Sequence, residues 1–356
     1  MPSFLQFLIR RFLIIPVSLL VITLVLYGGL MLTPPEARAI LYMPNSNRSL
    51  TEKQYKRLID LIILRYHLND PFHIQYALWI KSLLQGAWGY SPSLNEDVLP
   101  ALVRRTPVTL ELAFYSLLGF IPLGLVSGLG AGWKPKRPFD NLFRSLAYVG
   151  TSMPTFILSM VLLAFFYVNL KWFSPERLSL TYGLQVNGPG FRNFTGLLSL
   201  DSLLNGRIDI FVDSLRHLVM PVFTLSLYHW ATLGRVIRSV VMGEKDKEYI
   251  IAARARGVHE RQVLWKHAFR VVLAPALTSV GISAASILSG VFVVEIIFGF
   301  RGISEVIVQA MSDIPDAAST LGFAVYSVLL ILLLMFILDV VQAVLDPRLR
   351  EEALKS

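Results

Sequence analysis

The stretch FLIIPVSLLVITLVLYGGLMLT, residues 12–33, contains no charged side chain. A helix rises about 1.5 Å per residue, so about 20 apolar residues cross the roughly 30 Å hydrocarbon layer of a bilayer. A segment in lipid must satisfy its backbone hydrogen bonds internally, which favours a helix. The stretch also lacks the small-residue cleavage site of a secretory signal, so we expect a retained transmembrane helix.

The composition of the whole chain agrees with a lipid environment. Of its 356 residues, 54% are hydrophobic and only 16% are charged, whereas soluble domains carry about a quarter charged residues. The net charge of +9 fits the basic cytoplasmic loops of a membrane protein. Cysteine is absent, which excludes disulfides and thiolate metal sites.

Five more segments are long and apolar enough to span a membrane. They are residues 109–132, 145–168, 216–239, 274–299 and 319–345. No alternation typical of a barrel strand is present. The sequence therefore predicts an all-α membrane protein with six transmembrane helices.

The distribution of Lys and Arg orients these helices. Basic residues gather before the first span, between the second and third, between the fourth and fifth, and after the sixth. Six spans place those four regions on one side, which the positive-inside rule makes cytoplasmic. Both termini are then cytoplasmic, and the basic excess needs no nucleic acid to explain it.

Two longer regions are predicted to face outward. Helix-like apolar spacing marks residues 51–68 and 73–85, with an Asn-Asp-Pro break at 69–71. Residues 169–215 are irregular, with short helical pieces expected. The predicted organisation is a first transmembrane helix (1–33), an extracytoplasmic region (34–108), a core of five transmembrane helices with a cytoplasmic loop at 240–271 (109–346), and a cytoplasmic tail (347–356).

A charged stretch, EYIIAARARGVHERQVLWKHAFRVVLAP (248–275), interrupts the apolar pattern between the fourth and fifth spans. We expect helices at Glu248–Arg256 and Glu260–Phe269, separated by a left-handed turn at Gly257. Small residues would let another protein approach the first helix closely, and charged residues would fix its register. The small residues are Ala252, Ala253 and Gly257, and the charged residues are Glu248, Arg254 and Arg256.

Two other interpretations of this stretch were weighed. A solvated loop would carry the same charges simply through the orientation rule. A DNA-reading helix-turn-helix is disfavoured because both ends are tethered to membrane helices, which keeps the segment from entering a major groove.

The pattern Ala-Ala-x-x-x-Gly (252–257), followed by a basic helix and Pro275, resembles the coupling motif of ABC-importer permeases. The resemblance is to the dipeptide/oligopeptide/nickel branch, a binding-protein-dependent transport system inner-membrane component, and it covers nearly the whole chain. Further stretches that carry it are LNDPFHIQYALWIKSLLQGAWGYS (68–91), RRTPVTLELA (104–113), GTSMPTFILSMVLL (150–163), LRHLVMPVFTLSL (215–227), VVEIIFGFRGI (293–303) and LDPRLR (345–350). The chain departs from the family pattern at 33–36 and 301–304, which leaves the substrate class open.

The resemblance implies a plasma-membrane permease that is not itself an enzyme. The sequence has no Gly-x-x-x-x-Gly-Lys-[Ser/Thr] phosphate loop, so ATP and Mg²⁺ would be bound by two partner ATPase subunits. A homologous second permease subunit and an extracytoplasmic solute-binding protein would complete the assembly. The 251–258 helix would sit in a groove on the ATPase and transmit its movement to the fourth and fifth spans, giving alternating access.

The cargo implied by the branch is a dipeptide or oligopeptide, with oligosaccharides or nickel chelates as alternatives for the same machinery. An ion-coupled secondary transporter is the rival from another class. It would require charged residues near mid-span, and here they cluster at span ends. A membrane scaffold or insertase-like protein is a third alternative.

Polar residues within the spans are candidates for the substrate pathway. Ser279, Ser283 and Ser286 fall on one face of the fifth span, where small residues serve either helix packing or a pathway lining. Glu295, near the outward end of that span, is a candidate for an outer gate or an interfacial residue. Glu111 is predicted to cap the first turn of the second span. We predict no catalytic residue and no metal site.

Overall fold

The computed structural model describes residues 3–40, 51–312 and 316–345. The predicted cytoplasmic tail lies outside these residues. The long helices are α1 (Ser3–Leu30), α5 (Val98–Trp133), α10 (Ile208–Glu244), α13 (Phe269–Phe298) and α15 (Ala317–Leu345). The all-α prediction is confirmed.

Shorter elements connect the long helices. They are α2 (Pro35–Ile40), α3 (Glu52–Arg65), α4 (Phe72–Leu84), α6 (Pro138–Ser152), α7 (Thr155–Leu162), α8 (Leu180–Val186), α9 (Leu198–Leu204), α11 (Glu248–Ala255), α12 (Glu260–Gln262) and α14 (Ser304–Ala310), with π-helices η1 (Leu163–Asn169) and η2 (Val263–Ala268). Within the described residues, strands are confined to an antiparallel pair, β1 (Tyr90–Ser91) and β2 (Glu96–Asp97). The helical segments predicted at 51–68 and 73–85 are α3 and α4.

Five helices are long and apolar enough to cross a membrane, and the number is six if the bent pair in the region of the third predicted span counts as one span. That span is not the single helix predicted at 145–168. The chain bends by 103° between Pro138–Ser152 and Thr155–Asn169. Met153, at the bend, is extended (φ −96°, ψ 121°). The ring of Pro154 disfavours helical geometry in the residue before it.

Two other predicted boundaries were wrong. Helix α5 starts at Val98 rather than near residue 109. The helix predicted at Glu260–Phe269 does not end there, because α12, η2 and α13 form one continuous helix from Glu260 to Phe298. Pro275, expected to open the fifth span, lies inside it.

The chain forms two compact units. One comprises Met1–Thr106 with Ile303–Phe336, and the other Pro107–Gly302 with Ile337–Ser356. In the first unit, the buried Arg38 donates hydrogen bonds to Gln75 Oε1 (2.8 Å) and to the Leu68 carbonyl (2.9 Å). These bonds tie α2 to α4 and to the link between α3 and α4, since a buried guanidinium requires such acceptors.

A second polar network in the first unit surrounds Arg105. Its guanidinium contacts Glu96 at 3.1 Å and Glu305 at 2.8 Å. Burial raises the pKa of the Glu96 carboxyl, but hydrogen bonds from Arg105 and Arg104 outweigh it, and the pKa lies below the ordinary value. Glu96 therefore binds the hairpin to the start of α5 as a carboxylate.

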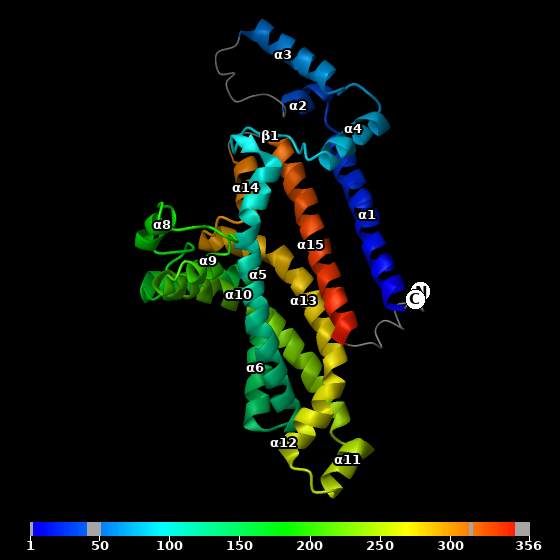
Figure 1. Cartoon of the computed structure of the whole chain (residues 1–356), viewed down its shortest axis with the longest axis vertical. Coiled ribbons are helices and arrows are strands. Elements are labelled where there is room, and N and C mark those ends of the chain that lie inside the picture. The colour runs from blue at the N-terminus through cyan, green and yellow to red at the C-terminus, as the bar shows by residue number, and fades with distance from the viewer. Residues whose placement is uncertain (1–2, 41–50, 313–315, 346–356) are drawn as a thin grey trace. The chain divides into compact units, whose positions relative to one another are not determined.

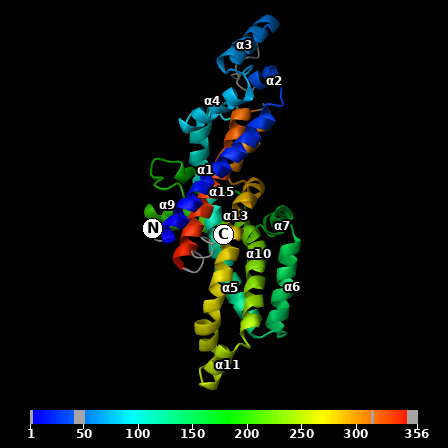
Figure 2. The same ribbon diagram turned by 90° about the vertical axis from the view of Figure 1, so that its right-hand side faces the viewer.

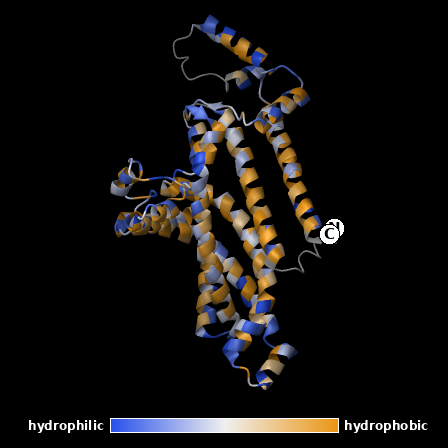
Figure 3. Ribbon diagram, in the orientation of Figure 1, coloured by the Kyte–Doolittle hydropathy of each residue, from blue (hydrophilic) through white to orange (hydrophobic). Residues whose placement is uncertain are grey.

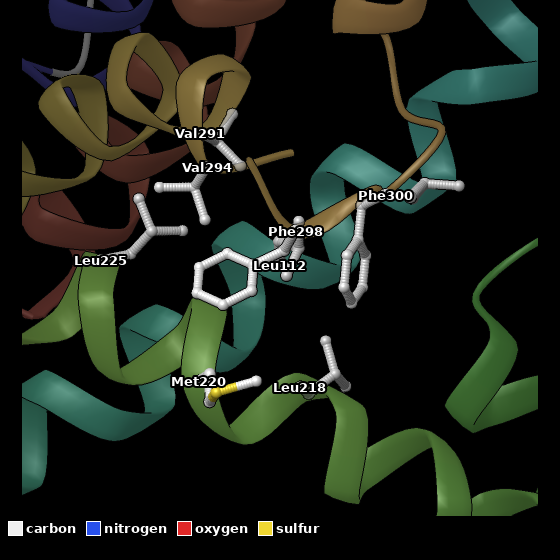
Figure 4. Close-up of a cluster of buried hydrophobic side chains, with 9 residues drawn as sticks. Leu112, Leu218, Met220, Leu225, Val291, Val294, Phe298 and Phe300 are labelled. Atoms are coloured by element: carbon white, nitrogen blue, oxygen red, sulfur yellow. The ribbon is translucent and has the colours of Figure 1, made fainter. Parts of the chain in front are cut away.

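In the second unit, α10 packs against α13, α6, α7 and α9. Figure 2 shows α6 alongside α10 and turning into α7. Buried side chains from α5, α10 and α13 converge in one core cluster, shown in Figure 4. Its members are Val108, Leu112, Leu218, Met220, Leu225, Val291, Val294, Phe298 and Phe300.

Glycines bring α5 and α10 into backbone contact. Gly124, Gly128 and Gly132 recur every four residues on α5 and therefore share a face. A Cβ atom added at Gly128 would lie 2.6 Å from the Gly234 carbonyl oxygen, and one at Gly132 would lie 2.8 Å from the Arg238 carbonyl oxygen. Small residues at this spacing allow close approach of membrane helices. The sequence analysis did not identify this repeat.

Candidate functional site

Helix α11 lies at one end of the second unit, beside α12 (Figure 1). This end is markedly more hydrophilic than the long helices leading to it (Figure 3). Gly257 ends α11 with φ +76°, and the Val258 amide donates to the Ala253 carbonyl at 3.2 Å. The left-handed turn predicted at Gly257 is thus present, at a conformation that glycine adopts without steric cost.

The small residues of the loop do not share one environment. Ala252 and Gly257 are exposed, whereas Ala253 is fully buried in a cluster with Ile250, Val263 and Ala268. The structure therefore assigns Ala253 to the packing of the loop itself, not to the surface that another protein could reach.

Arg254 also acts within the chain. Its guanidinium contacts the Glu260 carboxylate at 2.8 Å and the Lys245 carbonyl at 3.2 Å. It also lies over the Trp133 ring, with 5.1 Å from Cζ to the ring centroid. The polar registration predicted for Arg254 is thus made with its own loop and with the end of α5.

The exposed side of α11, here called its outer face, carries other residues of the predicted site. Glu248, Ala252 and Arg256 are exposed, and Ile251 between them is 53% exposed. Among the residues that the structure describes, the Arg256 Nε donates to the Ala252 carbonyl, at 3.3 Å. A short helix with an exposed apolar side chain, a small residue and charges of both signs is suited to contact another protein surface.

Tyr249 connects α11 to α10. Its hydroxyl donates to Glu244 Oε2 at 2.7 Å. Burial, followed by this hydrogen bond to a carboxylate, raises the pKa of Tyr249 to about 12. The phenol therefore remains a neutral donor at physiological pH. This role of Tyr249 was not predicted from the sequence.

A cavity of about 480 Å³ lies between α10 and α13. Ser279, Ser283 and Ser286 all line it, together with Tyr228, His229 and Thr232 from α10. The structure thus brings the three predicted serines together in the lining of one cavity. Their role in a substrate pathway stays a prediction.

Glu295 does not line that cavity. It is fully buried and accepts a hydrogen bond from Thr109 Oγ1. A side chain at Gly302 would collide with the Glu295 carboxylate, so the glycine makes room for it. Glu295 is therefore an interior residue joining α13 to α5, and its assignment as an outer gate or an interfacial residue stays a prediction.

Glu111 is not the helix cap that the sequence analysis predicted. It is 2% exposed and lies within α5, more than three turns after Val98. Its carboxylate contacts Arg177 Nη2 at 2.5 Å and accepts bonds from the Ser199 amide (2.7 Å) and hydroxyl (2.6 Å). It fastens the segment between η1 and α10 to α5.

A second side-chain hydrogen bond in the same segment joins Ser174 to α10. The Ser174 hydroxyl lies 2.8 Å from His217 Nε2. His217 Nδ1 lies 2.8 Å from the Asp213 backbone oxygen and 3.6 Å from the Asp213 carboxylate, which also accepts from the Ser179 amide. These contacts join the segment before α8 to α10.

Residues 121–351 match the family model described as binding-protein-dependent transport system inner membrane component. The dipeptide transport system permease protein DppB of Alkalihalophilus pseudofirmus is 30% identical over 80% of this chain and 84% of its own length. The di/tripeptide transport system permease protein DppB of Pseudomonas aeruginosa is 31% identical over 81% of this chain and 84% of its own. The dipeptide transport system permease protein DppB of Bacillus subtilis is 29% identical over 97% of this chain and 98% of its own.

The family match spans most of the membrane helices and the loop at α11, and the relatives extend it over nearly the whole chain. The chain belongs to the family of binding-protein-dependent transport system inner membrane components.

Proposed function

We propose that this chain is the permease subunit of an ATP-driven importer of dipeptides and oligopeptides. The observation that carries the proposal is the outer face of α11, where Glu248, Ile251, Ala252 and Arg256 are exposed on a helix fixed firmly to its own chain. The peptide cargo follows from the names of the relatives.

The energy source is a pair of partner ATPase subunits that bind ATP and Mg²⁺. The outer face of α11 sits on one of them, and this end of the second unit and both termini are cytoplasmic. A homologous second permease subunit and an extracytoplasmic solute-binding protein complete the importer in the plasma membrane.

Movement of the ATPase reaches the membrane helices through covalent continuity. Helix α11 follows α10 after three residues and precedes the continuous helix Glu260–Phe298. Tyr249 and Arg254 reinforce both connections. Displacement of α11 therefore tilts α10 and α13, and changes the cavity that Ser279, Ser283 and Ser286 line between them.

The test is reconstitution of the chain with its native partners in vesicles. ATP-dependent uptake of a labelled dipeptide supports the proposal, and gradient-driven uptake by this chain alone contradicts it. Ala252→Arg should abolish ATP-dependent uptake while the chain still inserts. Gly243→Arg is the control, because it adds the same charge on α10 at a position where an added Cβ atom meets no neighbouring atom within 4 Å.

A further inference from the structure

The largest cavity among those described in the second unit lies between α6 and α10 and has a volume of about 750 Å³. It is separate from the serine-lined cavity, sharing none of its lining residues. Arg144, Arg235 and Arg238 line it, together with Asn141 and Tyr148. Neither the coupling loop nor the proposed pathway accounts for this concentration of guanidinium groups.

The charge of the cavity is not balanced from within the second unit. Arg238 is neutralised by Asp140, which is fully buried and lies 2.6 Å from Arg238 Nε. Arg144 and Arg235 are exposed, and neither makes a salt bridge within the part of the chain that the structure describes. Three guanidinium groups thus line the cavity and Asp140 neutralises one of them, so the excess positive charge attracts an anion.

Exposed apolar side chains of α6 lie next to the cavity in sequence. Val149 lines the cavity, and Leu142 and Leu146 precede it at helical spacing outside the lining; the three are 52%, 58% and 49% exposed. Tyr148, at the rim, is 73% exposed, and tyrosine is enriched at the level of lipid headgroups. A molecule that fills this site must combine a negative group with long apolar chains.

We propose that the cavity between α6 and α10 binds the phosphate headgroup of an anionic phospholipid. Arg144 and Arg235 contact the phosphate, and the acyl chains lie along Leu142, Leu146 and Val149. The cytoplasmic leaflet carries anionic lipids, and basic pockets between membrane helices on that side suit their headgroups. The location rests on the proposed orientation of the chain, whereas the chemistry of the site depends only on its residues.

The test is native mass spectrometry of the full-length chain released from bilayers of phosphatidylcholine with phosphatidylglycerol. Wild-type chain should retain phosphatidylglycerol preferentially. The double variant Arg144→Gln/Arg235→Gln should reduce that preference roughly 30-fold, because each basic residue near a membrane surface contributes about a factor of five. Arg144→Lys/Arg235→Lys keeps the charge and should retain most of the preference.

Arg270→Gln is the matched control, since Arg270 is an exposed arginine at the start of α13 that does not line the cavity. Equal retention of the two lipids by wild-type chain, or an equal loss in Arg270→Gln, would overturn the proposal. Displacement of the lipid by inorganic phosphate would instead make this a site for free anions. A crosslink from Tyr148 to the second permease subunit or the ATPase would assign the cavity to a protein partner. The lipid measurement does not depend on transport, so absence of lipid binding would leave the importer proposal intact.

Discussion

The guanidinium of Arg254 lies 5.1 Å from the centre of the Trp133 ring, so the short helix α11 is bound to the last residue of α5. The same arginine is paired with Glu260 at 2.8 Å. One side chain thus joins the helix before the Gly257 turn, the helix after it, and the end of the second span.

Arg254 and Arg256 should respond differently to the same substitution. Arg254→Gln removes the ion pair and the ring contact, each worth about 0.5–1 kcal/mol at a partly exposed site. Hydrogen exchange at residues 248–257 should then accelerate several-fold. Arg256→Gln should leave exchange unchanged and lower ATPase coupling in the assembled importer. Equal exchange in the two variants would mean that Arg254 does not hold the loop.

The predicted close approach of another protein at Gly257 can be tested with Gly257→Asp and Gly257→Asn. Asp and Asn tolerate positive φ better than other residues, so the turn is kept while a side chain is added to the exposed position. Both variants should insert into the membrane and hydrolyse ATP with the partners, but transport should no longer follow hydrolysis. Gly206→Asn is the control, since Gly206 also has positive φ (+69°) and open space around it. Wild-type coupling in both Gly257 variants would refute the need for a glycine at this exposed position.

The contact of α5 with α10 predicts opposite effects at two glycines. Gly128→Ala should lower the free energy of unfolding by roughly 1–3 kcal/mol, because its Cβ would lie 2.6 Å from the Gly234 carbonyl oxygen. Gly243→Ala should raise it by up to about 1 kcal/mol, since alanine favours a helix over glycine and no atom lies within 4 Å. Thermal unfolding of the full-length chain in detergent measures both changes.

Glu111→Gln should release the segment that precedes α10. The free energy of unfolding should fall by roughly 3 kcal/mol, at the lower end for a broken buried ion pair, because the Arg177 side chain is 25% exposed. Limited proteolysis should show new cleavage between residues 176 and 205. Asp209→Asn is the control, since it breaks an exposed pair with Arg207, and it should change the cleavage pattern little.

Glu96 predicts a dependence of stability on pH in the first unit. Its pKa is lower in the folded chain than the ordinary 4.5. Its contribution is therefore present above that unfolded value and is lost as the pH falls through the folded pKa. Between pH 7 and pH 3, Glu96→Gln should lose less thermal stability than wild-type chain. Parallel losses in the two proteins would show that Glu96 does not contribute.

The helices were predictable from sequence where a single physical constraint dominates. Lipid requires about 20 apolar residues in a helix, and the first, second, fourth, fifth and sixth spans were located on that basis alone. The bend in the third predicted span was not predicted, because a bent pair of apolar helices has the same composition as one straight helix. Only the backbone geometry at Met153 and Pro154 shows the bend.

The candidate site was predicted in part. The turn at Gly257 follows from the conformational freedom of glycine, and its place between α11 and α12 could be inferred from local sequence. The distinction between Ala252 and Ala253 could not, because it depends on the cluster that buries Ala253, to which Trp133 contributes from the end of α5, 120 residues earlier in the chain. The Glu111 and Arg177 pair is likewise 66 residues apart. The glycine repeat on α5 was the signal available in the sequence that could have revealed the contact with α10.

The contact of α5 with α10 limits which parts of the second unit can move independently. Two helices whose backbones touch over successive turns cannot slide past or rotate against each other without steric collision, so they form a single rigid strut. Opening and closing of a passage must then occur elsewhere, at the bend between α6 and α7 or at the contact of α13 with α10.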